Sequence, residues 1–231
     1  MSIFDSHPAH VVHFYREDST LLDELTLYIG DALVKGNAVL ALATRSHLDA
    51  LARKLKAKGL DVSKVTVQGR YQPVEASTAL SQIMANGKPD PARFVDLIGG
   101  LMDRAKAAAE GEQSKTVIFG ELVALLWAEG KHDAAMELEQ LWNDLAKTRK
   151  FFLRCAYPMA GFSRPEYTEP FLKLCAAHSS VIPEEAYASL PTDEDRRRTV
   201  AALQQRLEAL EEQKAAYESE QQLRLFVDAV Q

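Results

Sequence analysis

Three largely apolar runs constrain the fold of this chain more than any other feature. They are NAVLALAT at residues 37–44, TVIFG at 116–120 and FFLRCAYP at 151–158. Each has the length of a strand, and none alternates apolar with polar residues as a strand with one wet face would. Strands of this kind must be covered on both faces. We therefore predict an α/β fold with three layers, in which a mostly parallel sheet lies between two layers of helices.

The order of the first elements predicts how the strands pair. Residues 10–15 (HVVHFY) are rich in β-forming side chains, and residues 22–33 repeat apolar side chains at helical spacing up to a stop at Gly36. The apolar strand at 37–44 follows directly. A strand, a helix and a strand in close succession require a right-handed crossover and parallel pairing. The further elements that we predict are a helix at 46–58, a strand at 65–68 (VTVQ), helices at 75–85 and 92–109, two helices between 121 and 147, and a helix at 167–178.

Composition excludes several classes of protein. The chain has 231 residues, of which 47% are hydrophobic and 26% charged, enough for one domain with a real core and an appendage. The net charge of -6 and the dispersed basic residues argue against a nucleic-acid partner. Neither a signal peptide nor a membrane span is recognisable, so we predict a cytoplasmic protein without a membrane partner. Cys155 and Cys175 form no CxxC motif and are expected to be reduced.

The first turn after a strand, YREDST at residues 15–20, decides against nucleotide hydrolysis. A phosphate-binding turn needs glycines, whose backbone N–H groups approach phosphate closely, and a lysine that reaches the outer phosphates. This turn has neither, and it carries Glu17 and Asp18 where phosphate would bind. We predict a chain with the topology of a nucleotide-binding protein but without its phosphate chemistry.

Several stretches together resemble one known family. They are HVVHFYREDSTLL, GNAVLALATRSHLDAL and, most specifically, GELVALLW, LEQLWNDLA and CAYP. Over about residues 9–180 the chain is similar to the MEDS domain, the methanogen/methylotroph DcmR sensory domain. The resemblance implies a RecA-like or circadian-clock-ATPase-like fold with a degenerate phosphate loop. It also implies an input module of a histidine kinase or transcription regulator that senses small molecules such as hydrocarbon derivatives. Glu75 departs from the family pattern, in which an aspartate is expected.

The carboxyl ends of parallel strands form the usual ligand edge of an open α/β sheet, so residues there are our candidates. Glu121 follows the TVIFG strand, and we consider ligand contact and simple helix capping as equal alternatives for it. Arg70 and Tyr71, which follow the predicted third strand, could meet an anionic or aromatic ligand or lie in a solvated loop. The full candidate set is Tyr15, Thr44, His47, Gln68, Arg70, Tyr71, Glu121 and Tyr157.

Other reactive side chains have structural interpretations. Trp127 lies on a helix that is apolar nearly all round and is expected in the core. His10 and His13 stand three residues apart on a strand and point to opposite faces, so we predict no metal site from this run. Cys155 is expected to be a small buried side chain. The chain lacks the serine-hydrolase elbow and the HExxH zinc pair, and we predict neither a catalytic role nor a cofactor.

A second region, residues 192–231, is predicted to be a linker helix of coiled-coil type. Val200, Leu203, Leu207 and Leu210 occupy a and d positions, although the pattern weakens at Lys214. The alternative is a single amphipathic helix that packs back on the domain. We expect a homodimer through this helix and a downstream PAS or kinase domain, because the closing LRLFVDAVQ is similar to the first helix of a PAS domain.

Two functional classes remain from the sequence. The first is a non-catalytic sensory domain (residues 1–185) that binds a small molecule of unidentified chemistry. The second is an active nucleotide-binding protein or NTPase of the RecA-like class with a non-standard phosphate loop. The acidic YREDST turn favours the sensory domain, because phosphate transfer would require a cation there.

Overall fold

The computed structural model divides the chain into two compact units, Met1–Glu185 and Ala186–Gln231. Within the first unit it describes residues 10–111 and 114–185, and within the second only residues 190, 192–194, 197–198, 201 and 205. The described positions 193–194, 197–198, 201 and 205 are helical. Most of the predicted linker helix, including its heptad positions, lies outside the described residues.

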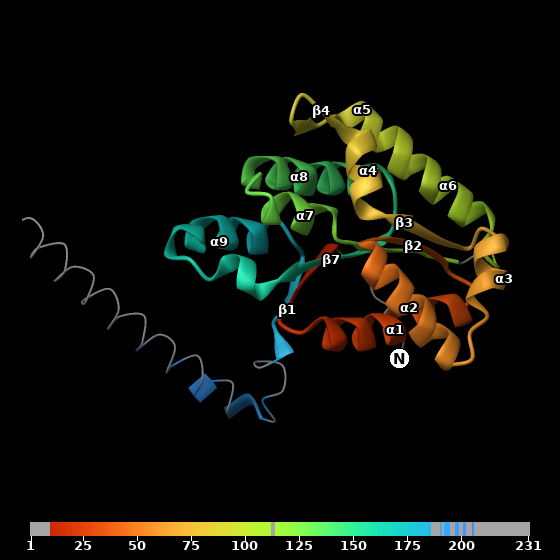
Figure 1. Cartoon of the computed structure of the whole chain (residues 1–231), viewed down its shortest axis with the longest axis horizontal. Coiled ribbons are helices and arrows are strands. Elements are labelled where there is room, and N and C mark those ends of the chain that lie inside the picture. Colours follow the sequence, from red (N-terminus) through yellow and green to blue (C-terminus); the bar gives the residue numbers. More distant parts are fainter. Residues whose placement is uncertain are drawn as a thin grey trace, which may run out of the picture. The chain divides into compact units, whose positions relative to one another are not determined.

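The first unit is built on a sheet of six parallel strands in the order β3-β2-β6-β7-β1-β8 (Figure 1). The predicted α/β fold with a parallel sheet is confirmed. β2 is buried at every position, as its unbroken apolar run predicts. The strands are β1 (His10–Tyr15), β2 (Ala38–Ala43), β3 (Tyr71–Glu75), β6 (Thr116–Gly120), β7 (Phe152–Pro158) and β8 (Ser180–Ile182).

Helices cover both faces of this sheet (Figure 1). One face packs against α1 (Asp18–Val34), α2 (Arg45–Ala57) and α3 (Val62–Val67). The other face packs against α4 (Ala76–Ile83), α5 (Pro91–Phe94), α6 (Gly100–Ala107), α7 (Leu122–Ala128), α8 (His132–Thr148) and α9 (Thr168–Ala176). A π-helical turn joins α5 to α6, and β4 (Met84–Ala85) pairs with β5 (Lys88–Pro89) in a small hairpin. Two apolar cores result, one on each side of the sheet.

Local capping explains where the helices next to the strand ends begin. The side chain of Thr44, directly after β2, accepts a hydrogen bond from the His47 N–H in the first turn of α2. Glu75 ends β3 and caps α4 by accepting the N–H groups of Ser77 and Thr78. The hydroxyls of Ser77 and Thr78 also donate to Glu75, and these bonds, followed by those from the backbone, lower the pKa of Glu75 to about 2. Helices therefore start immediately at the carboxyl edge of the sheet.

The predicted strand at residues 65–68 is wrong, because these residues belong to α3 and the turn after it. Asp61 caps this helix through the Lys64 N–H, and Gly69 ends it with a φ of 81°. Val67 is 90% exposed, which a strand of the central sheet would not allow. The third strand starts instead at Tyr71. It lies at the edge of the sheet, where Pro73 is tolerated.

Among the described residues, no helix combines the length and apolar character that a membrane span requires.

Candidate functional site

Four of the predicted residues meet at the carboxyl ends of β1, β2 and β6. Glu121, only 3% exposed, accepts the Thr44 backbone N–H at 2.8 Å through Oε2. Its Oε1 accepts a 2.5 Å hydrogen bond from His47 Nδ1. Tyr15 is close enough that the carboxylate of Glu121 adds to the effect of burial in raising the Tyr15 pKa. We call Tyr15, Thr44, His47 and Glu121 the edge group.

Glu121 is not the side-chain cap of its own helix. The described residues show no capping hydrogen bond from its carboxylate to α7. Its backbone N–H continues the sheet by donating to the Leu42 carbonyl at 2.9 Å. The carboxylate instead ties the end of β6 to the end of β2 and to α2. The capping alternative for Glu121 is therefore wrong.

The edge group carries a buried charge pair. The hydrogen bond to Glu121 raises the pKa of His47 to about 9, although burial opposes this shift. Asp18, whose Oδ2 lies 3.4 Å from His47 Nε2, contributes in the same direction. His47 is thus an imidazolium at neutral pH, held between two carboxylates. Perturbed pairs of this kind at the ligand edge of a sheet are common in functional sites and also occur in structural ion pairs.

The turn between β1 and α1 is already occupied by a carboxylate of the same chain. The backbone N–H groups of Arg16 and Glu17 donate to the two carboxylate oxygens of Glu185, at 2.9 and 3.1 Å. The Arg16 guanidinium pairs with Glu184 through two hydrogen bonds of 3.0 Å. Backbone N–H groups here are the ones that a phosphate loop would offer to phosphate. In this chain they hold an internal anion.

Gln68, Arg70 and Tyr71 lie away from the edge group, because they precede or begin the third strand instead of following its carboxyl end. Gln68 and Arg70 line a groove of about 570 Å³ between α1, α2 and α3. Arg70 donates to the Leu33 carbonyl at 2.8 Å, and Tyr71 is 1% exposed. The structure thus contradicts their predicted place at the carboxyl edge.

Tyr157 is fully buried on the opposite face of the sheet from the edge group, so it is not a pocket rim. Its hydroxyl donates to Glu139 Oε1 at 2.8 Å. Burial, reinforced by the Glu139 carboxylate, raises the Tyr157 pKa well above its usual range. Tyr157 therefore points to a second polar group inside the molecule.

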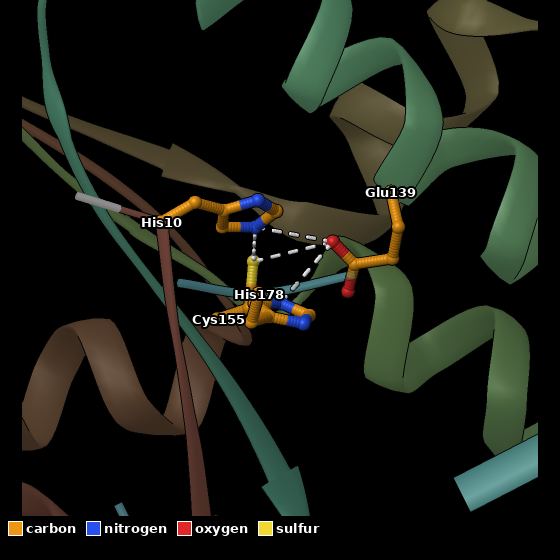
Figure 2. Close-up of side chains that lie close together, drawn as sticks. All are labelled: His10, Glu139, Cys155 and His178. Carbon is orange, nitrogen blue, oxygen red and sulfur yellow. Dashed lines mark hydrogen bonds and ion pairs between the residues drawn. The ribbon is translucent and has the colours of Figure 1, made fainter. Parts of the chain in front are cut away.

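This second group consists of His10, Glu139, Cys155 and His178, which converge from β1, α8, β7 and the segment before β8 (Figure 2). One nitrogen, oxygen or sulfur atom from each lies within 4.8 Å of the others. Glu139 and Cys155 are completely shielded from solvent. Burial, and then the nearby Glu139 carboxylate, raises the pKa of the Cys155 thiol. We call these four residues the buried group.

The family model for "MEDS: MEthanogen/methylotroph, DcmR Sensory domain" matches residues 9–171. The chain belongs to the MEDS family. The resemblance noted from the sequence motifs is thereby confirmed, and with it a sensory role in signalling. None of the curated proteins matches the sequence.

The MEDS match contains the whole edge group and three members of the buried group. His178 and β8 lie beyond residue 171. The CAYP and LEQLWNDLA motifs of the MEDS domain supply Cys155, Tyr157 and Glu139, which thus meet around one carboxylate. Two of the motifs that identify the family therefore build the buried group.

Sequence reasoning missed the buried group of the MEDS domain because its members are far apart in the chain. The prediction that His10 and His13 face opposite sides is confirmed, since His10 contacts Glu139 whereas His13 lies 3.5 Å from Glu24 of α1. One signal was present. Glu139 follows Ala135 by four residues on the apolar face of α8, and a carboxylate there needs partners.

Proposed function

We propose that this MEDS domain is the input module of a cytoplasmic signalling protein, a histidine kinase or a transcription regulator. It responds to a small molecule at the carboxyl edge of the sheet and does not hydrolyse nucleotides. The observation that carries the proposal is the buried Glu121–His47 pair. It lies where open α/β sheets bind ligands, and it joins three elements through one carboxylate.

The same edge offers a route from ligand to output. Glu184 and Glu185 hold the turn after β1, and they are the last residues before the second unit of the chain. Exposed ion pairs of this kind contribute only about 0–1 kcal/mol, so a bound ligand has enough free energy to break them. We propose that ligand binding at the edge group alters this contact. The change then passes to residues 192–231, which form the dimer.

The test compares Glu121→Gln with Glu75→Gln in the signalling protein that carries this domain. Both substitutions remove one carboxylate charge at the carboxyl edge of the sheet, but Glu75 is a half-buried helix cap whose hydrogen bonds within the described residues go to Ser77 and Thr78 and not to the edge group. The amide of Glu121→Gln can still accept the Thr44 N–H but loses the charge pair with His47. We expect Glu121→Gln to change basal or ligand-induced output several-fold, and Glu75→Gln to leave it unchanged.

Thermal melts of both variants separate signalling from stability. Equal output in the two variants, with the Glu121→Gln domain merely less stable, would show that the edge group is structural and that the sensory site lies elsewhere.

A further inference from the structure

We propose that the buried group, His10, Glu139, Cys155 and His178, binds one divalent transition-metal ion of the zinc class. The proposal is independent of where the small molecule binds. It rests on the spacing of four ligand atoms, on the hydrogen bonds behind them and on their burial (Figure 2).

Four of the six distances between the ligand atoms are close to the edges of a metal-centred tetrahedron. His10 Nε2 lies 3.2 Å from Glu139 Oε2 and 3.3 Å from Cys155 Sγ. Glu139 Oε2 lies 3.4 Å from His178 Nε2 and 3.9 Å from Cys155 Sγ. A tetrahedral ion with bonds of about 2.0–2.3 Å places its ligand atoms roughly 3.2–3.8 Å apart. The remaining two pairs, His10–His178 and Cys155–His178, lie within 4.8 Å, so an ion at the centre requires mainly a shift of the His178 side chain.

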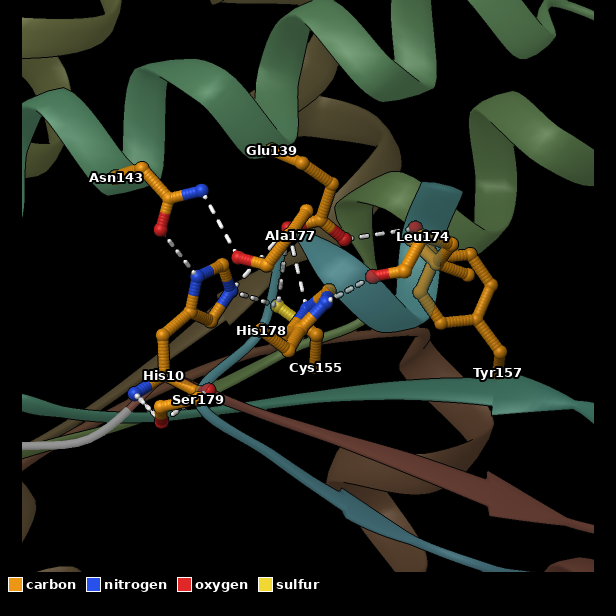
Figure 3. A network of polar contacts seen from close by, with 9 residues as sticks. All are labelled: His10, Glu139, Asn143, Cys155, Tyr157, Leu174, Ala177, His178 and Ser179. Carbon is orange, nitrogen blue, oxygen red and sulfur yellow. Dashed lines mark hydrogen bonds and ion pairs between the residues drawn. The ribbon is translucent and has the colours of Figure 1, made fainter. Parts of the chain in front are cut away.

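Hydrogen bonds behind the two histidines aim their free nitrogen atoms at this centre (Figure 3). His178 Nδ1 lies 2.7 Å from the Leu174 carbonyl, which can only accept, so Nδ1 carries the proton. His10 Nδ1 donates to Asn143 Oδ1 at 3.0 Å, and the amide group of Asn143 donates to the Ala177 carbonyl at 3.0 Å. Both imidazoles then present unprotonated Nε2 atoms to the carboxylate and the thiol. Histidines that bind metals are oriented by this kind of outer hydrogen bond.

The centre has few proton donors: among the described side chains, the Cys155 thiol and the Tyr157 hydroxyl donate to Glu139, and neither reaches His178 Nε2. Among the described residues, His178 Nε2 is buried without a hydrogen-bond partner, since its contact with Glu139 lacks hydrogen-bond geometry. Two nitrogen lone pairs and a carboxylate facing one another at this depth need a cation or an added proton. A divalent ion satisfies all four ligands at once, and it would also hold Cys155 as the thiolate.

The ligand types select the ion. Two imidazoles, one thiolate and one carboxylate match zinc and its neighbours in the first transition series, whereas magnesium and calcium require oxygen ligands. Four protein ligands leave no open position, so the ion is structural or regulatory. It would fasten α8 and the segment before β8 to β1 and β7, close to the end of the first unit.

Cobalt(II) titration of the metal-free chain tests the proposal. Cys175→Ser serves as the background, because it leaves Cys155 as the only thiol. We expect one Co²⁺ per chain, a near-ultraviolet thiolate-to-cobalt band and strong visible bands of a tetrahedral ion, all displaced by Zn²⁺. The spectrum of a six-coordinate ion with oxygen ligands, or no saturable binding, would overturn the proposal.

A pair of variants on α8 tests the outer hydrogen bond. Asn143→Ala removes the acceptor of His10 Nδ1, and we expect it to weaken Zn²⁺ binding about 10–100-fold. The matched control is Gln140→Ala, because Gln140 is exposed on the same helix and, within the described part of the chain, its side chain hydrogen-bonds only to Asp144. It should leave the affinity unchanged. Equal Zn²⁺ affinity in the two variants, measured by competition with a chelating dye, contradicts the assigned geometry. If Asn143→Ala does not fold, the cobalt spectrum of the Cys175→Ser chain alone decides whether the buried group binds a metal ion.

Discussion

Glu121→Ala is expected to lower the free energy of unfolding by about 2–4 kcal/mol, because it removes one partner of a buried ion pair. The substitution leaves the Thr44 N–H without its acceptor and His47 without its main counter-ion. Urea unfolding monitored by circular dichroism measures the loss. Glu75→Ala is the control, since it removes a helix cap without a buried ion pair and should cost only about 0.5–2 kcal/mol.

The same pair predicts a pH dependence. The pKa of His47 is raised to about 9 in the folded state, against about 6.5 in an unfolded chain. The stabilisation of the folded state by protonated His47 is therefore complete below pH 6.5 and is lost as the pH rises through about 9. The difference in stability between wild type and Glu121→Ala should shrink over this interval. Two results would contradict the Glu121–His47 pair. One is a stability difference between wild type and Glu121→Ala that stays constant from pH 6.5 to 9.5. The other is a loss of less than about 1 kcal/mol in the free energy of unfolding of Glu121→Ala.

The double substitution Leu203→Lys and Leu207→Lys is expected to convert a dimer into a monomer. Both leucines are predicted on the apolar seam of the linker helix, and burying each contributes about 1.5–3 kcal/mol. Loss of two such contacts in each chain should raise the dimer dissociation constant by about 100-fold or more. Sedimentation velocity measures the association, and circular dichroism should show the α/β unit still folded.

The control places the same charges off the seam. Ala201→Lys with Gln205→Lys adds two lysines at predicted outward positions of the same helix. This variant should remain dimeric and keep its signalling output, whereas the seam variant should lose output. If the Leu203→Lys and Leu207→Lys variant dimerises with unchanged affinity, the linker helix is not the interface, and the dimer must form through the first unit of the chain.

The strands that the sequence predicted well are those with two buried faces. β2 is apolar throughout, β6 and β7 are largely apolar, and burial of the sheet on both faces accounts for this pattern. The segment at 65–68 failed because Val65 and Val67 mimic strand alternation while Asp61 and Gly69 delimit a helix. β8 was not predicted, since three residues with two exposed positions carry almost no periodic signal.

The candidate site residues were also predicted correctly only where the strands next to them were. Tyr15, Thr44, His47 and Glu121 were found because each lies at or just after the end of a correctly predicted strand, and parallel strands bring their ends to one edge. Gln68, Arg70 and Tyr71 were misplaced because the third strand was predicted at residues 65–68, whereas it begins at Tyr71. The buried group depends on contacts between β1, α8, β7 and the segment after α9. In the sequence, the one sign of the buried group is the carboxylate of Glu139 on an apolar helix face.

If the carboxyl edge of this sheet binds a small molecule and no longer binds phosphate, as we propose, Mg-ATP should not bind there, and calorimetry with Mg-ATP tests this most directly. Arg16 and Glu17 already bind the Glu185 carboxylate through their N–H groups, and the turn carries two further acidic side chains. We expect no saturable heat with millimolar Mg-ATP and no release of phosphate. Micromolar binding of Mg-ATP that is abolished by substitutions within residues 16–20 would contradict the account and establish the chain as a nucleotide-binding protein.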